Sequence, residues 1–192
     1  MISEFSEIAD YTYESNEIRP TLFDFLGHRA LDFVKSNSFA VPGPAETFVI
    51  EDYNYFASVS TFLNLKPETT DSLNTSFFAV RLFQELTRFH QEKNNTAALV
   101  LIELERLQYL RYKSVLPNNE DLFYQGLQRL TQAYKESPFV SEVWHELALF
   151  HSTRAYNYNH LADTTHRWDN KIAHEICTKT MKQFDGEYGA EQ

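Results

Sequence analysis

Apolar residues recur every three or four positions along most of this 192-residue chain, which is the period of an amphipathic α-helix. Residues 73–91, for example, carry Phe77, Val80, Phe83 and Leu86 at that spacing. The pattern predicts helices over residues 21–35, 73–91, 96–116, 122–135, 141–156 and 168–184. Most of these ranges are joined by short polar turns, so consecutive helices should become antiparallel neighbours. The expected fold class is all-α.

Small and large apolar residues in the C-terminal half follow a longer spacing that repeats. Gly126, Leu130 and Ala133 hold small, large and small positions of one helix, and Pro138 follows them. The pattern continues at Trp144, Leu147, Ala148 and Ala173. This spacing is typical of tetratricopeptide repeats, in which helix pairs stack because one pair cannot bury its apolar face alone. It predicts stacked antiparallel helix pairs in a tetratricopeptide-like right-handed superhelix, with Trp144 and Leu147 packed against Leu130 and Ala133.

The remaining segments are less regular. Residues 3–17 are acidic and form at most one short helix, and residues 36–51 contain Pro42-Gly43-Pro44 and are expected to be a loop. Residues 53–65 mix aromatic and small polar side chains, which leaves their structure open. In the helix predicted over 96–116, the water-facing side is expected to carry Glu103, Glu105, Arg106 and Arg111. Residues 1–192 should form a single helical-repeat domain that is part of a longer chain.

Charge and cysteine content exclude several classes of function. The net charge is −10 and no basic run is present, so nucleic acid and anionic membrane surfaces are poor partners. No apolar stretch is long enough to cross a bilayer, and the acidic start Met1-Ile2-Ser3-Glu4 lacks the apolar core of a signal peptide. Cys177 is the one cysteine, so an intramolecular disulfide and a cysteine-cluster metal site are excluded. Its position predicts a small buried side chain.

Two histidine patterns resemble catalytic or metal sites. His145 and His151 are six residues apart and point to different sides of a helix, whereas a zinc-protease helix needs a spacing of four. We expect no metal and no cofactor, with His145 exposed and His151 in an aromatic slot between two helices. Asp24, His28 and Asp32 follow each other at spacings of four, which suits either an oriented general base or a polar stripe between helices. The stripe is favoured because no nucleophile motif or phosphate loop accompanies it.

A polar segment with several rings, residues 157–166, separates the last two helices. Its candidate partner-binding residues are Tyr156, Tyr158, His160 and His166, and Trp168 lies just beyond them. Loops that present rings on a rigid scaffold often bind partners. The alternative, which we favour about two to one, is that the rings fold back and cover the helix ends.

Several stretches of the chain resemble a known family. They are residues 19–33, which run from Arg19-Pro20-Thr21-Leu22-Phe23 to Phe33, and residues 104–107, 124–130 and 134–151. Together they resemble the N-terminal helical (tetratricopeptide-like) region of large alpha-2-macroglobulin-like proteins of Bacteroidetes. The resemblance implies an exported parent protein of the cell envelope, in the periplasm or at the outer membrane. The protease-trapping thioester motif of that family, Cys-x-Glu-Gln, is not carried over, because Cys177 is followed by Thr178-Lys179-Thr180.

These observations support two leading hypotheses of function. The first is a non-catalytic scaffold or protein–protein interaction module of a protease-trap-type envelope protein, whose partners are other modules of the same chain or a protein ligand. The second is a free-standing tetratricopeptide-type adaptor that binds a peptide or protein in its concave groove. An enzyme that uses Asp24, His28 and Asp32 is a distant third. Neither leading hypothesis involves nucleic acid or membrane insertion.

Overall fold

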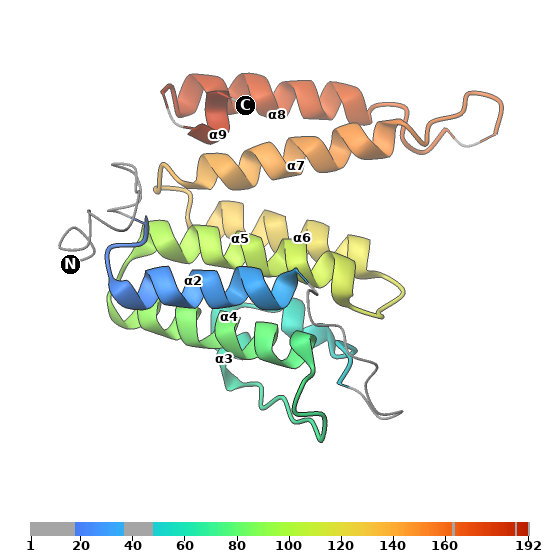
Figure 1. The fold of residues 1–192 in the computed structure, drawn as a ribbon. Coiled ribbons are helices and arrows are strands. Elements are labelled where there is room, and N and C mark those ends of the chain that lie inside the picture. The colour runs from blue at the N-terminus through green and yellow to red at the C-terminus, as the bar shows by residue number, and fades with distance from the viewer. Residues whose placement is uncertain (1–17, 37–47, 163, 187, 192) are drawn as a thin grey trace. The chain divides into compact units, whose positions relative to one another are not determined.

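The computed structural model describes residues 18–36, 48–162, 164–186 and 188–191 (Figure 1). The helix predicted over 3–17 and most of the loop predicted over 36–51 lie outside these ranges. The described residues form helices without a strand, and their one extended pairing is an isolated bridge between Ile50 and Ser114. The all-α prediction is therefore confirmed for this part of the chain.

The helices follow the predicted ranges closely. They are α2 (Leu22–Lys35), η2 (Tyr53–Phe56), α3 (Val59–Asn64), α4 (Thr75–Glu92), α5 (Thr96–Lys113), α6 (Asn119–Ala133), α7 (Val140–Ala155), α8 (Asp169–Gln183) and α9 (Tyr188–Glu191). Residues 53–65, which the pattern left open, form the short helices η2 and α3. The chain divides into two compact units after Phe123, within α6. Whether the chain is one repeat domain stays a prediction.

Asparagine and threonine side chains set where several helices begin. The Thr21 hydroxyl accepts from the Asp24 N–H, and the Asp24 carboxylate accepts from the Thr21 N–H, which forms a capping box. Asn74 and Asn95 cap α4 and α5 by accepting from the N–H groups of Phe77 and Ala98. These caps explain why the helices start where the apolar pattern starts.

The turn between α4 and α5 has a specific backbone conformation. Asn94 adopts a left-handed φ of 53°, which asparagine tolerates better than most residues. The Asn95 N–H then donates to the His90 carbonyl at 3.0 Å, the six-to-one bond of a Schellman motif. One asparagine thus ends α4, and the next begins α5 with almost no linker.

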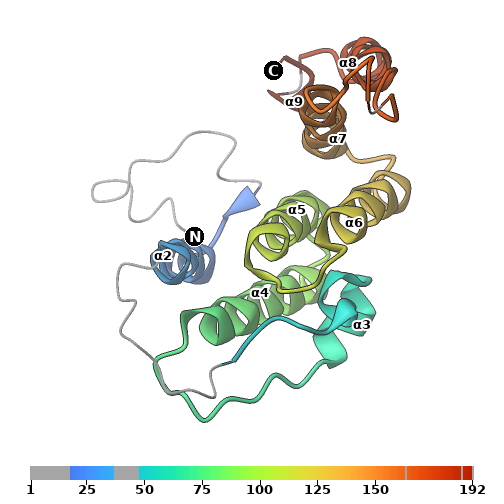
Figure 2. The ribbon, with the colours of Figure 1, turned by 90° about the vertical axis from the view of Figure 1, so that its right-hand side faces the viewer.

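Helices α2, α4 and α5 form the core of the N-terminal unit. Near the start of α2, Asp24 lies 3.3 Å from His90 near the end of α4, so these two helices run in opposite directions. Near the end of α5, Tyr109 donates to Ser76 at the start of α4, so this pair is antiparallel as well. Figure 2 looks nearly along these helices and shows α4 beside α5.

Helix α5 is buried on a side that the sequence assigned to water. Arg106 is completely buried, and Glu103 is almost so, whereas both were expected on the exposed face. The Arg106 guanidinium donates to the carbonyls of Tyr55 and Ala57 and to the Glu103 carboxylate. It also lies 4.3 Å from the centre of the Phe62 ring. The prediction was wrong because η2 and α3 cover this face, and the carbonyls of Tyr55 and Ala57, in and just after η2, supply partners that periodicity does not reveal.

Helices α7, α8 and α9 pack together in the C-terminal unit, as Figures 1 and 2 show. His151 near the end of α7 contacts Asp169 at the start of α8, and Lys179 near the end of α8 lies over Trp144 near the start of α7. The two helices are therefore antiparallel. Helix α9 packs against the start of α7 so closely that a Cβ atom at Gly189 would clash with the α7 backbone. A glycine is needed there for this short helix to dock.

The predicted contacts of the repeat motif are only partly present. Leu130 and Leu147 are buried, as expected, and the Tyr124 ring of α6 stacks on Phe150 of α7 at 5.1 Å between centroids. Ala133 is exposed, so the predicted packing against it is wrong. Trp144 is half-buried, with its ring 5.3 Å from the Lys179 ammonium of α8.

Candidate interaction surface on the C-terminal unit

A long connection, residues 156–168, joins α7 to α8 and is defined here as the α7–α8 connection. It extends well past the ends of the two helices that it joins (Figure 1). Tyr156 is 89% exposed, Leu161 84% and Trp168 59%, and Tyr158 is exposed as well. The favoured expectation, that Tyr156 and Tyr158 pack on the helices, is therefore wrong. Large exposed rings next to a rigid helix pair are typical of interaction surfaces.

The two candidate histidines of this connection differ in their surroundings. His160 is exposed, near the exposed Tyr158 and Leu161 in the chain. His166 is half-buried, and its Nδ1 lies 3.1 Å from the Asp169 carboxylate. The four residues proposed from sequence are thus divided between three exposed side chains and one that anchors the connection.

The anchor is a polar cluster centred on the buried Asp169, the first residue of α8. One carboxylate oxygen, Oδ1, lies 3.3 Å from His151 Nδ1. The other, Oδ2, lies 3.3 Å from Arg154 Nε and 3.1 Å from His166 Nδ1. A carboxylate at a helix N-terminus is also favoured by the helix dipole. The cluster ties the end of α7, the end of the connection and the start of α8 together.

His166 has two competing partners within this cluster. Its Nδ1 lies 3.1 Å from an Arg154 amino group and 3.1 Å from Asp169 Oδ2. One ring nitrogen cannot accept from the guanidinium and donate to the carboxylate at the same time. In either tautomer His166 Nδ1 keeps one of these two partners. The C-terminal end of the connection therefore stays bonded to the helix ends, while the rings of Tyr156 and Tyr158 remain exposed.

Two cationic side chains lie next to the Trp168 ring. The Arg167 guanidinium lies 4.9 Å and the Lys171 ammonium 5.9 Å from the ring centre. Both distances are within the range of cation–π attraction. An exposed ring flanked by an arginine and a lysine offers apolar area and positive charge at one place.

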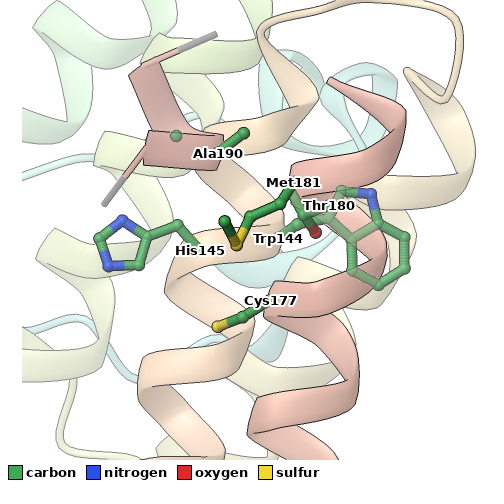
Figure 3. Close-up of a pocket in the computed structure, with 7 residues that line it drawn as sticks. Trp144, His145, Cys177, Thr180, Met181 and Ala190 are labelled. Carbon is green, nitrogen blue, oxygen red and sulfur yellow. The ribbon is translucent and has the colours of Figure 1, made fainter. Parts of the chain in front are cut away.

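A separate pocket of about 260 Å³ lies at the other end of α7 and α8, next to α9 (Figure 3). It is lined by Trp144, His145, Cys177, Thr180, Met181, Gly189 and Ala190. Figure 3 shows the side chains of Cys177 and Met181 extending from α8, whereas the His145 imidazole points away from both sulfur atoms. Sequence reasoning missed this pocket. The small Gly189-Ala190 pair near the end of the chain was its one sequence signal.

Two predictions about these side chains are wrong. Cys177 is exposed, although its repeat position predicted burial. His145 is half-buried rather than exposed, because it lies beside the pocket under α9. The prediction for His151 is confirmed, since it is buried with its ring 5.5 Å from Tyr124 and 5.9 Å from Phe150.

The acidic and histidine stripe of α2 lies mostly inside the N-terminal unit. Asp24 and His28 are buried, and Asp32 is exposed. The buried carboxylate pairs with His90 of α4, while His28 lies 3.8 Å from Glu105 of α5, which also pairs with Lys35. Burial lowers the pKa of His28 from 6.5 to about 3, with smaller contributions from Arg19, His90 and Lys35. Burial also lowers the pKa of His90, and the Asp24 carboxylate opposes that shift. The contacts of Asp24, His28 and Lys35 thus connect α2 to α4 and α5.

Within the described ranges, no group of three or more His, Cys, Asp or Glu side chains is arranged to hold a metal ion. No helix among the described residues combines the length and apolar character needed to cross a bilayer. Comparisons of the chain with protein-family models, curated proteins and solved structures give no match.

Proposed function

We propose that this chain is a non-catalytic helical interaction module of an envelope-associated, alpha-2-macroglobulin-like protein. The observation that carries the proposal is the α7–α8 connection, which exposes Tyr156, Leu161 and Trp168 on a helix pair held by the Asp169 cluster. Interfaces draw most of their binding energy from such aromatic and arginine side chains. The resemblance to the Bacteroidetes family supplies the envelope location and the parent protein.

Polar side chains in the N-terminal unit support a scaffold function. Arg106 donates to the Glu103 carboxylate and to the carbonyls of Tyr55 and Ala57, and Asp24 lies 3.3 Å from His90 between two helices. Each of these groups holds helices together within the core, where a substrate has no access. Stacked helix pairs in a tetratricopeptide-like superhelix are part of the proposal, because such stacks present broad surfaces to partners.

Hydrogen exchange tests this function. A first check is whether the open reading frame continues past Gln192 into β-rich modules. Exchange is then measured for residues 157–166 in the 192-residue chain and in the longer native protein. A gain of protection only in the longer protein is the expected result, because docking would cover the rings. Strong and equal protection in both proteins would refute a partner site.

Two other outcomes separate the competing functions. Weak protection in both proteins would argue against docking within the parent chain and for a free-standing adaptor. Metal analysis of the purified chain should find no stoichiometric zinc, and His28→Ala and His145→Ala should leave docking intact in folded protein. Zinc bound at one per chain and lost in His145→Ala would replace the interaction module with a metal site.

A further inference from the structure

Two cationic side chains lie beside an exposed ring where the α7–α8 connection meets α8. Between residues 154 and 171 the sequence has three basic residues, Arg154, Arg167 and Lys171, and two acidic ones. One of the acids, Asp169, is buried and already contacts Arg154 and His151. The second acid, Asp163, lies outside the described residues, and the charged side chains over the Trp168 ring are both cationic, in a chain whose net charge is −10.

We propose that Trp168, Arg167 and Lys171, together with the exposed rings of the connection, bind an acidic protein segment that carries an aliphatic or aromatic side chain beside its carboxylates. This inference rests on the proposed interaction function and names the chemistry of the partner. Carboxylates of the segment pair with Arg167 and Lys171, and its apolar side chain covers the exposed face of Trp168.

The two cations are accessible to a ligand carboxylate. Arg167 is exposed, and its guanidinium lies over the Trp168 ring, where it keeps its planar donors available for a bidentate pair. Lys171 contacts Glu175 at 3.7 Å, but both side chains are about two-thirds exposed. Such exposed i,i+4 pairs are weak, so a ligand carboxylate readily displaces Glu175.

The exposed apolar side chains of this surface favour a ligand that has apolar groups as well as negative charge. Tyr156, Leu161 and Trp168 are among the most exposed large apolar side chains of the described chain. Covering them releases water from apolar surface, which a free carboxylate or phosphate cannot do. Nucleic acid also offers negative charge, but the net charge of −10 repels a polyanion over a long distance. A short acidic peptide segment satisfies both the local charge and the apolar area.

The experiment uses the full 192-residue chain and Trp168 as the reporter. Trp144→Phe leaves Trp168 as the single tryptophan, since the chain has two. Random-peptide phage display on this protein is expected to enrich sequences with Asp or Glu next to Leu, Phe or Tyr. A synthetic copy of an enriched peptide is then titrated, with Trp168 fluorescence as the readout. Binding should weaken as the salt concentration rises.

Variants locate the binding site. Arg167→Glu combined with Lys171→Glu should weaken peptide binding about tenfold or more, because two attractive pairs become repulsive. Lys179→Glu combined with Lys182→Glu changes the net charge equally near the other end of α8, away from the connection, and should leave peptide binding within about twofold of the wild-type value. Circular dichroism confirms that both double variants fold.

Four outcomes overturn the inference. In phage display, they are the enrichment of peptides without acidic residues and the failure to enrich any peptide. In titrations, they are an equal loss of binding in both double variants and tighter binding of an oligothymidylate than of the acidic peptide. None of them changes the hydrogen-exchange result expected in the longer protein. Failure of the acidic-segment proposal is therefore distinguishable from failure of the interaction function.

Discussion

The N-terminal and C-terminal units differ in how they bury charged side chains, although both expose rings such as Tyr112 and Tyr156. The N-terminal unit buries charged groups, among them Arg106, Glu103 and Asp24, and pairs each of them with a side chain or backbone group inside. The C-terminal unit has one buried charged cluster, at Asp169, and exposes Tyr156 and Trp168 next to it. A buried ion pair fixes how helices fit together, whereas an exposed ring beside a fixed helix end is available to a partner. Under the proposed function, the first unit holds helices together and the second unit contacts the partner.

The largest effect is expected where the N-terminal unit depends on one side chain. Arg106→Met removes the donors to the carbonyls of Tyr55 and Ala57 and leaves the buried Glu103 carboxylate without its cation. Breaking a buried pair in this way should cost about 3–5 kcal/mol of unfolding free energy. Urea unfolding followed by circular dichroism measures the loss.

Two further variants sharpen the Arg106 result. Arg88→Ala removes an exposed arginine paired with Glu85 at i,i+3 and should change stability by less than about 0.5 kcal/mol. Replacing both members of the buried pair, Glu103→Leu with Arg106→Met, should cost less than Arg106→Met alone, because no charge is left unpaired. If Arg106→Met behaves like Arg88→Ala, the buried network does not hold the N-terminal unit.

The C-terminal unit should be most sensitive at Leu147. This side chain is buried in α7, and Leu147→Ala should cost about 2–5 kcal/mol through lost burial and the cavity left behind. Leu149 is a matched control on the same helix, since it is exposed, and Leu149→Ala should cost far less. A loss under about 1 kcal/mol for Leu147→Ala would place this residue outside the core and remove support for a repeat.

The sequence predicted the helices of both units better than it predicted their side-chain environments. Periodicity located α4 and α7 to within about two residues, because an apolar stripe is a local signal, and the Asn74 cap adds a second local signal at α4. It placed Arg106 in water, because the cover comes from η2, about 50 residues earlier in the chain. The periodicity of a helix indicates which of its sides is apolar. It does not indicate which carbonyl groups, far away in the sequence, will accept hydrogen bonds from a buried guanidinium.

The candidate site was predictable in part for the same reason. Its position was visible in the long polar gap between two helices, and Tyr156, Tyr158, His160 and His166 all fall in or beside it. The Asp169 cluster was missed, although His151 and Arg154 of α7 are three residues apart, as are His166 at the end of the connection and Asp169 at the start of α8. Spacing shows which side chains share a face, but the meeting of the two pairs depends on how α7 packs on α8.

Acid should affect the N-terminal unit through His28. Its pKa is about 3 in the folded state against 6.5 when exposed, so the folded state binds fewer protons between these values. The stability that this burial contributes is therefore full above pH 6.5 and is lost as the pH falls toward 3. His28→Gln should flatten the fall in unfolding free energy over that range, as measured by urea unfolding at several pH values.

The histidine of α8 provides the matched control for this pH effect. His174 is exposed, and His174→Gln should leave the slope of stability against pH unchanged. A slope that does not differ between the wild-type protein and His28→Gln would show that protonation of His28 does not destabilise the fold. Burial of this histidine would then not explain any acid sensitivity of the N-terminal unit.

The smallest effect on stability is expected at the exposed rings, where the effect on binding should be largest. Tyr156→Ala and Trp168→Ala remove side chains that are 89% and 59% exposed, so the unfolding free energy should change by no more than about 0.5 kcal/mol. The same changes should reduce protection of residues 157–166 in the longer protein, because an aromatic anchor is lost from the interface.

Phe150→Ala is the contrasting control, since that ring is buried against Tyr124 and should lower stability by about 3–5 kcal/mol. If Trp168→Ala destabilises the isolated chain as strongly as Phe150→Ala does, the Trp168 ring belongs to the core. The C-terminal unit would then lack the exposed ring on which its proposed binding role depends. If Trp168→Ala changes neither stability nor protection, the partner docks elsewhere, and the exposed aromatic side chains of the connection have no part in binding.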